Sequence, residues 1–147
     1  MFIAGSEENF IISDFIDNSG SMSKQTIRNH YQIPVGAKVK VEFKFQDGQY
    51  QEGVLFIQEV AVYNSQEKGY WDYHDKLGTG EGPEYLAGTF TMQVGNEYKT
   101  FSPETLEFIS KGWIYVLGAT SEVGKDNWWV FPPKVNVGYL KVSYSIQ

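Results

Sequence analysis

Alternation of apolar and polar residues is the feature of this sequence that most constrains its fold. Over residues 39–46, charged side chains separate four apolar ones, Val39, Val41, Phe43 and Phe45. A period of two is typical of a strand that buries one face. Asp47-Gly48 follows directly, and this pair favours a two-residue hairpin turn because both residues tolerate positive φ. We therefore predict a strand over residues 38–46 and a hairpin partner that begins at Gln49.

Similar short strands recur along the chain between turn signals. Ile33-Pro34-Val35-Gly36 is typical of a turn, since proline presets φ and glycine completes the reversal. Ser102-Pro103-Glu104 is typical of the start of one short helical turn, or simply of a loop. Further strands are expected over residues 9–16, 26–32, 60–63, 88–94, 97–101, 112–117 and from 135 to the C-terminus.

The last strand carries its own irregularity. Its apolar positions change parity at Gly138-Tyr139, which predicts a β-bulge or bend there. Beyond that point, one face of the strand is expected to enter the core with Leu140, Val142, Tyr144 and Ile146.

These patterns favour an all-β fold. A chain of 147 residues is the size of one domain and can bury a core without cross-links, so residues 1–147 are treated as a single domain. We predict a two-sheet antiparallel sandwich or jelly roll of about nine strands, with a closed β-barrel as the alternative.

Charge and cysteine content exclude several classes of function. The formal net charge is −6 and Arg28 is the only arginine, so no basic stripe is available for nucleic acid. Contact with a membrane would have to rest on something other than charge. The chain contains no cysteine, which excludes disulfides and thiolate metal sites. Neither a signal peptide nor a transmembrane segment is recognisable, and we expect a cytoplasmic or non-classically released protein.

One segment offers residues for acid–base chemistry. On an extended backbone, the side chains of Asp72 and His74 in Asp72-Tyr73-His74-Asp75 would point the same way. A carboxylate can orient an imidazole for catalysis or metal ligation, with Glu81 or Glu84 as a further oxygen donor. A hydrolase using His74 is therefore one hypothesis, and an ordinary exposed histidine in a polar loop is the alternative. His30 is expected to face solvent.

Hard oxygen donors also gather near the first strand. Asp14, Asp17, Asn18, Ser19 and Ser21 are ligand types that calcium prefers. They lack the spacing of an EF-hand, so a solvated turn is the alternative interpretation. Ca²⁺ is the one cofactor that the sequence suggests, and no other is expected.

Aromatic residues in irregular segments suggest a binding site. A tryptophan beside carboxylates and amides suits a sugar, because the apolar face of a pyranose packs on the ring while polar groups bind its hydroxyls. We predict a non-enzymatic, lectin-like module that binds a glycan or another small polar ligand. The candidate ligand-binding residues are Trp71, Asp72, Tyr73, His74, Asn127, Trp128 and Trp129.

Two other interpretations of the aromatics stay open. They could close the ends of the sandwich, or form subunit or lipid contacts in a self-assembling structural or membrane-active β protein, with a homo-oligomer as one outcome. A glycan binder should present a polar, partly concave patch beside a tryptophan. An assembly protein should present a flat apolar patch or an open sheet edge.

Overall fold

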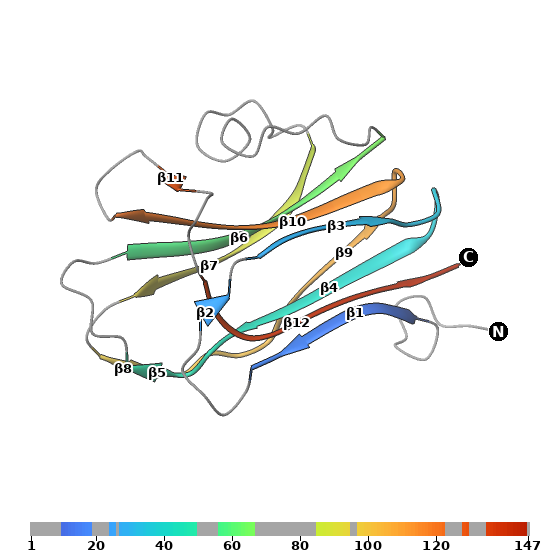
Figure 1. Ribbon diagram of the computed structural model, residues 1–147. Helices are drawn as coiled ribbons and strands as arrows, with labels where there is room; N and C mark the ends of the chain where they lie inside the picture. Colours follow the sequence, from blue (N-terminus) through green and yellow to red (C-terminus); the bar gives the residue numbers. More distant parts are fainter. Residues whose placement is uncertain are drawn as a thin grey trace.

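The chain folds into two antiparallel sheets that pack face to face (Figure 1). This is a computed structural model, and it describes residues 10–18, 24–25, 27–49, 56–66, 85–94, 97–122, 128–129 and 135–146. The predicted all-β two-sheet sandwich is confirmed, and the sheets do not close into a barrel. In the part of the chain that the structure describes, no helix is long and apolar enough to span a membrane.

The first sheet brings together segments from both ends of the chain. Its strand order is β1 (Ile11–Asp17), β12 (Val135–Ser145), β4 (Lys38–Phe45) and β9 (Glu104–Ile109). The short strand β2 (Lys24–Gln25) also pairs with β12. The C-terminal strand is therefore central, and β1 forms one edge of the sheet.

The second sheet is built from the middle of the chain and is ordered β11, β10, β6 and β7. Strand β3 also pairs with β10, and a separate two-stranded ribbon joins β5 to β8. The bounds of these strands are β3 (Arg28–Gln32), β5 (Gly48–Gln49), β6 (Phe56–Ser65), β7 (Leu86–Val94), β8 (Tyr98–Lys99), β10 (Trp113–Glu122) and β11 (Trp128–Trp129).

The main core lies between the inner faces of the two sheets. The predicted inward face of β4 is confirmed, since its four apolar residues are at most 1% exposed: Val39, Val41, Phe43 and Phe45. The Phe43 ring stacks on Phe90 of β7 with 5.6 Å between centroids, and it meets Phe45 edge-on at 4.7 Å. The alternating apolar side chains of β4 are therefore buried, because the strands packed against them supply apolar side chains such as Phe90.

On β12, the predicted core face is confirmed except at its last apolar position, Ile146. Leu140 and Val142 are buried, and Tyr144 is partly buried against the main core. Ile146 is 67% exposed, so the prediction that it enters the core is wrong. The reason is that β12 ends at Ser145, and Ile146 has no strand beside it to cover it.

The bulge predicted in β12 is confirmed. Val137 pairs with Phe45 and Tyr139 with Lys44, which leaves Gly138 as the extra residue. A Cβ atom at Gly138 would lie 2.9 Å from the carbonyl oxygen of Lys44. Glycine is therefore required here by the close approach of two backbones.

The hairpin predicted at Asp47-Gly48 is wrong. Strand β4 is flanked by β12 and β9, so its continuation cannot fold back on it. Gly48 and Gln49 instead pair with β8, and neither Asp47 nor Gly48 has positive φ. The Asp47 carboxylate accepts hydrogen bonds from the Phe101 backbone N–H (2.7 Å) and from Lys44 Nζ (3.1 Å). Strand pairing and the long-range contact with Phe101 outweigh the local turn preference, and the chain crosses to the second sheet.

Two further local predictions have clear outcomes. The turn at residues 33–36 is confirmed, with Gly36 at φ 92° and the Ala37 N–H bonded to the Pro34 carbonyl. The helical interpretation of Ser102-Pro103-Glu104 is wrong and the loop alternative holds for Ser102 and Pro103, because strand β9 begins at Glu104 after four residues without regular structure, 100–103. Pairing with β4 fixes this segment as a strand.

Polar contacts join the two sheets at both sides of the core. The buried Gln58 of β6 accepts hydrogen bonds through Oε1 from the backbone and side-chain N–H groups of Asn136 in β12. At the other side, the Tyr31 hydroxyl of β3 donates to Asp14 of β1 at 2.9 Å. Burial, together with the Asp14 charge, raises the pKa of Tyr31. The tyrosine therefore remains protonated and keeps its donor role.

Candidate functional site

The outer face of the second sheet carries a second apolar cluster. Ala61 and Tyr63 of β6 lie beside Tyr115 and Leu117 of β10, and all four are at most 2% exposed. The partly buried aromatic residues Tyr85 and Trp113 pack against them. This sheet is therefore apolar on both faces, and the partly buried Tyr85 and Trp113 are the aromatic members of the cluster that reach the surface.

Strand β3 supplies the polar rim of this face. His30 pairs with Tyr115 across the strands, and Gln32 pairs with Trp113. The exposed His30 ring lies 6.2 Å from the Trp113 ring and 6.0 Å from the Tyr115 ring, measured between centroids. We call His30, Trp113 and Tyr115 the aromatic rim. Neighbouring rings are tilted by 32–39° to each other; His30 and Trp113 reach the surface, whereas Tyr115 is only 2% exposed.

Hydrogen-bonding side chains flank the aromatic rim. Gln32 and Arg28 are both exposed on β3, two residues to either side of His30 and therefore on the same face. Together they offer an amide oxygen, an amide NH₂ and a guanidinium. The arrangement combines a partly exposed indole with donors and acceptors in one row.

A carboxyl group lies further along the same face, where Glu59 pairs with Ala119, four residues beyond Tyr115 on β10. Burial raises the pKa of Glu59 on β6 above its ordinary value. Burial and the charge of Glu59 also raise the pKa of Tyr63, four residues further along the strand. Tyr63 therefore stays protonated, while Glu59 ionises less readily than a glutamate in water.

Most of the residues selected from the sequence lie outside the described residues. This applies to Trp71, Asp72, Tyr73, His74 and Asn127. Their predicted roles, including the hydrolase hypothesis for His74, stay predictions.

The structure does place the backbone of the paired tryptophans. Trp128 and Trp129 form β11 and pair with Ser121 and Thr120 of β10. On this strand, Trp113 lies seven residues before Thr120, a separation of about 24 Å along an extended chain. The structure thus keeps β11 apart from the aromatic rim, at the other end of the same sheet (Figure 1).

The oxygen-rich segment near β1 is partly described. The carboxylate of Asp14 accepts a hydrogen bond from Tyr31, which gives it a structural role in joining the sheets. Within the described ranges, no group of three His, Asp or Glu side chains lies close enough to hold a metal ion. Ser19 and Ser21 lie outside those ranges, so calcium binding there stays a prediction.

Trp113 is not among the candidate residues that the sequence suggests, and His30 is expected only to face solvent. Residues 112–117 are predicted only as a strand. A usable signal is present, because aromatic residues occupy positions 113 and 115, and aliphatic ones occupy 114 and 116. Because side chains alternate between the two faces of a strand, this pattern predicts one aromatic face and one aliphatic face. His30 is exposed, as expected, but its ring contacts were not predictable without the pairing of β3 with β10.

Fold and surface define an all-β, two-sheet sandwich with an aromatic and polar rim on one outer face. Comparison with protein-family models, with curated proteins and with solved structures finds no match to this chain.

Proposed function

We propose that this protein is a non-enzymatic carbohydrate-binding module whose ligand packs on the aromatic rim. The observation that carries the proposal is the partly exposed Trp113 beside the exposed His30, with ring centroids 6.2 Å apart. An indole edged by polar residues on a sheet surface suits the apolar face of a pyranose ring.

The flanking side chains support a polyhydroxylated ligand. Gln32 offers both a donor and an acceptor, and Arg28 offers donors in a fixed fork. Sugar hydroxyls are both donors and acceptors, so they can use all of these groups. The net charge of −6 disfavours strongly anionic polymers. The proposal is therefore a neutral glycan rather than a sulfated or phosphorylated one.

Glycan-array binding followed by titration of the best ligand tests the proposal. Trp113→Ala should weaken binding by about 5- to 150-fold, corresponding to roughly 1–3 kcal/mol for a lost aromatic contact. His30→Ala alters an exposed side chain and should weaken binding without lowering the melting temperature. If the array shows no ligand, or if both variants bind like the parent protein, the proposed site is wrong.

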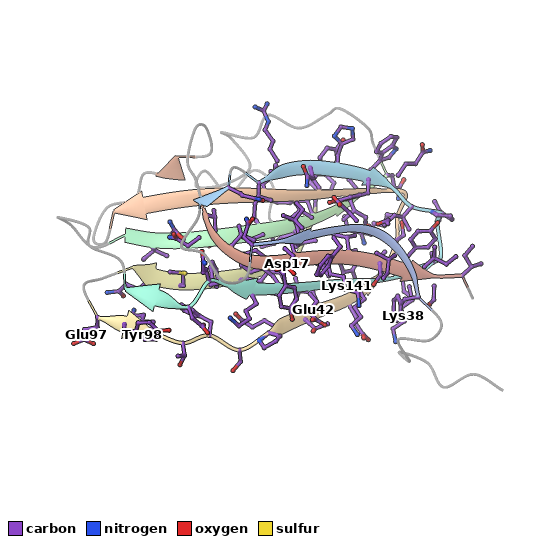
Figure 2. All side chains as sticks on the ribbon, turned by 60° about the horizontal axis from the view of Figure 1, so that its bottom comes forward. Asp17, Lys38, Glu42, Glu97, Tyr98 and Lys141 are labelled. Carbon is purple, nitrogen blue, oxygen red and sulfur yellow. The ribbon has the colours of Figure 1, made fainter. Side chains whose placement is uncertain are left out.

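Tyr98→Ala is the matched control. Tyr98 is 66% exposed and lies at the opposite end of the sandwich from Lys38 (Figure 2), whose end of the molecule also holds the start of β10. Its loss should leave glycan binding unchanged. The sequence-derived candidates Trp71 and Trp129 form a second pair of tests, since each alanine variant is expected to weaken binding if those residues extend the site.

A further inference from the structure

Strand β1 is an apolar edge in a molecule whose other edges are mainly polar. Ile11, Ile12 and Phe15 are 54%, 58% and 50% exposed. Among the described residues, β1 pairs with β12 alone, so its outer edge takes part in no strand pairing there (Figure 1). On the other described edges of the two sheets, Leu86 and Ile109 are exposed apolar residues, and the remaining exposed side chains are polar or charged: Arg28, His30, Gln32, Thr89, Thr91, Gln93, Glu104, Thr105 and Glu107.

Edge strands normally carry protection against pairing with another chain. Lysine and proline are two such devices, and the sequence of β1, Ile-Ile-Ser-Asp-Phe-Ile-Asp, contains neither; its protection is limited to a bulge and the inward-facing Asp14. Its one irregularity is a break in register between Ile12 and Asp14. A long, exposed, apolar edge without lysine is suited to β-augmentation, in which a further strand extends the sheet.

The break in register makes β1 complementary to itself. Ile12 and Phe15 lie opposite Ser143 and Lys141 of β12, on the outer face of the sheet. Ile11 and Ile16 lie opposite Tyr144 and Leu140, on the inner face. With one extra residue between the two halves, a two-fold axis between Ser13 and Asp14 places like faces together. Ile12 of one copy then lies opposite Phe15 of the other, and Ile11 lies opposite Ile16.

The same register separates the acidic residues. Asp14 falls opposite Ser13 of the second copy, and Asp17 falls opposite Phe10, so no two carboxylates face each other. A register shifted by one residue would place outward side chains opposite inward ones on both sides of the bulge. Shifting by two residues would instead place Ile11 opposite Asp14. The chosen register is thus the one that pairs apolar with apolar along most of the strand.

We propose that two copies of this chain associate through antiparallel β1–β1 pairing, which joins their first sheets into one continuous sheet. A second copy is the occupant because the strand complements itself in the two-fold arrangement, the commonest symmetry of protein dimers. The contact is limited to one strand and its neighbours, which is less than most stable interfaces bury. The dimer should therefore dissociate on dilution.

A shallow hollow beside the edge supports this occupant. It measures about 50 Å³ and is lined by Phe10, Ile12, Lys40, Lys141 and Ser143. Phe15 of the second copy, placed opposite Ile12, would lie next to this hollow. Figure 2 shows Lys141 on the outer face between Asp17 and Glu42, one strand in from the edge. The inner strands β12 and β4 thus carry charged side chains on the outer face of this sheet, whereas β1, at its edge, carries the exposed apolar residues Ile12 and Phe15.

Sedimentation velocity over a wide concentration range tests the association. The parent protein should shift from monomer to dimer as its concentration rises. Phe15→Lys should stay monomeric at every concentration, because a lysine would meet Ile12 of the second copy. Ile109→Lys is the matched control, since Ile109 is 52% exposed at the end of the other edge strand of this sheet. That variant should dimerise like the parent protein.

Disulfide trapping tests the register. The chain has no cysteine, so introduced thiols can react only with each other. An equimolar mixture of Ile12→Cys and Phe15→Cys proteins should form a mixed disulfide dimer, since directly paired residues lie within disulfide reach. Either variant alone should form far less. Cross-linking needs only a folded edge, so it remains informative if Phe15→Lys is unstable.

Three results would overturn the proposal. One is a monomer at every concentration, which is also the result expected if another protein's strand or a lipid surface occupies the edge. Another is a dimer that persists in Phe15→Lys. The last is efficient cross-linking of Ile12→Cys with itself, which requires a different register. None of these bears on glycan binding, because the aromatic rim lies on the other sheet.

Discussion

At the scale of single residues, the core depends on a few side chains with several partners each. Phe43 is fully buried and contacts both Phe90 and Phe45 through its ring. Phe43→Ala should lower the free energy of unfolding by about 3–5 kcal/mol, since it leaves a cavity between the sheets. Denaturant titration measures this loss. Phe15→Ala, at a position 50% exposed, should cost less than about 1 kcal/mol, and an equal cost would contradict the assigned core.

The buried carboxyl of Glu59 predicts a dependence of stability on pH. Because burial raises its pKa in the folded state, protonation of Glu59 favours the fold at low pH. This contribution is fully present below the unfolded pKa and is lost as the pH rises through the folded pKa. Glu59→Gln cannot ionise, so it should be more stable than the parent protein at neutral pH.

The stability gap between Glu59→Gln and the parent protein should close as the pH falls below the ordinary glutamate value of 4.5. Denaturant titrations at a series of pH values measure the gap. The exposed Glu97 supplies the control, because Glu97→Gln should follow the parent protein throughout. A gap that is constant with pH would show that Glu59 is not the group responsible.

At the scale of secondary-structure elements, the bulge in β12 sets the register of the first sheet. Gly138 allows the two halves of β12 to present apolar residues of opposite parity to one core. Gly138→Ala would bring a methyl group to 2.9 Å from the Lys44 carbonyl oxygen. We expect a loss of about 1–3 kcal/mol in the free energy of unfolding, as for overpacked sites. An unchanged melting temperature would mean that the bulge relaxes freely.

At the scale of the whole molecule, the fold depends on its last strand. β12 lies between β1 and β4 and contacts the second sheet through Asn136. A chain that ends at residue 134 should therefore lose its cooperative thermal transition, because β1 and β4 would have no partner between them. Removing only residues 146–147 should leave the transition in place, since β12 ends at Ser145. Circular dichroism during heating distinguishes the two outcomes.

The sequence by itself determined the class of fold and much of the core. The two-residue period in β4 and the change of parity at Gly138 each state which side of a strand is apolar, and that information is local. Both were therefore predictable without knowing any strand partner. The aromatic split at Trp113 and Tyr115 was equally present in the sequence, although its meaning depended on what lay beside it.

The tertiary structure alone decided which strands are neighbours. Asp47-Gly48 has the local preference of a hairpin, but β12 and β9 occupy both sides of β4 and the turn does not form. Pairing joins residues far apart in the chain, and a local propensity of about 1 kcal/mol cannot outweigh a whole ladder of hydrogen bonds and buried side chains. The same nonlocal pairing brings His30 to Trp113 and leaves β1 at an edge, so both proposed surfaces follow from topology.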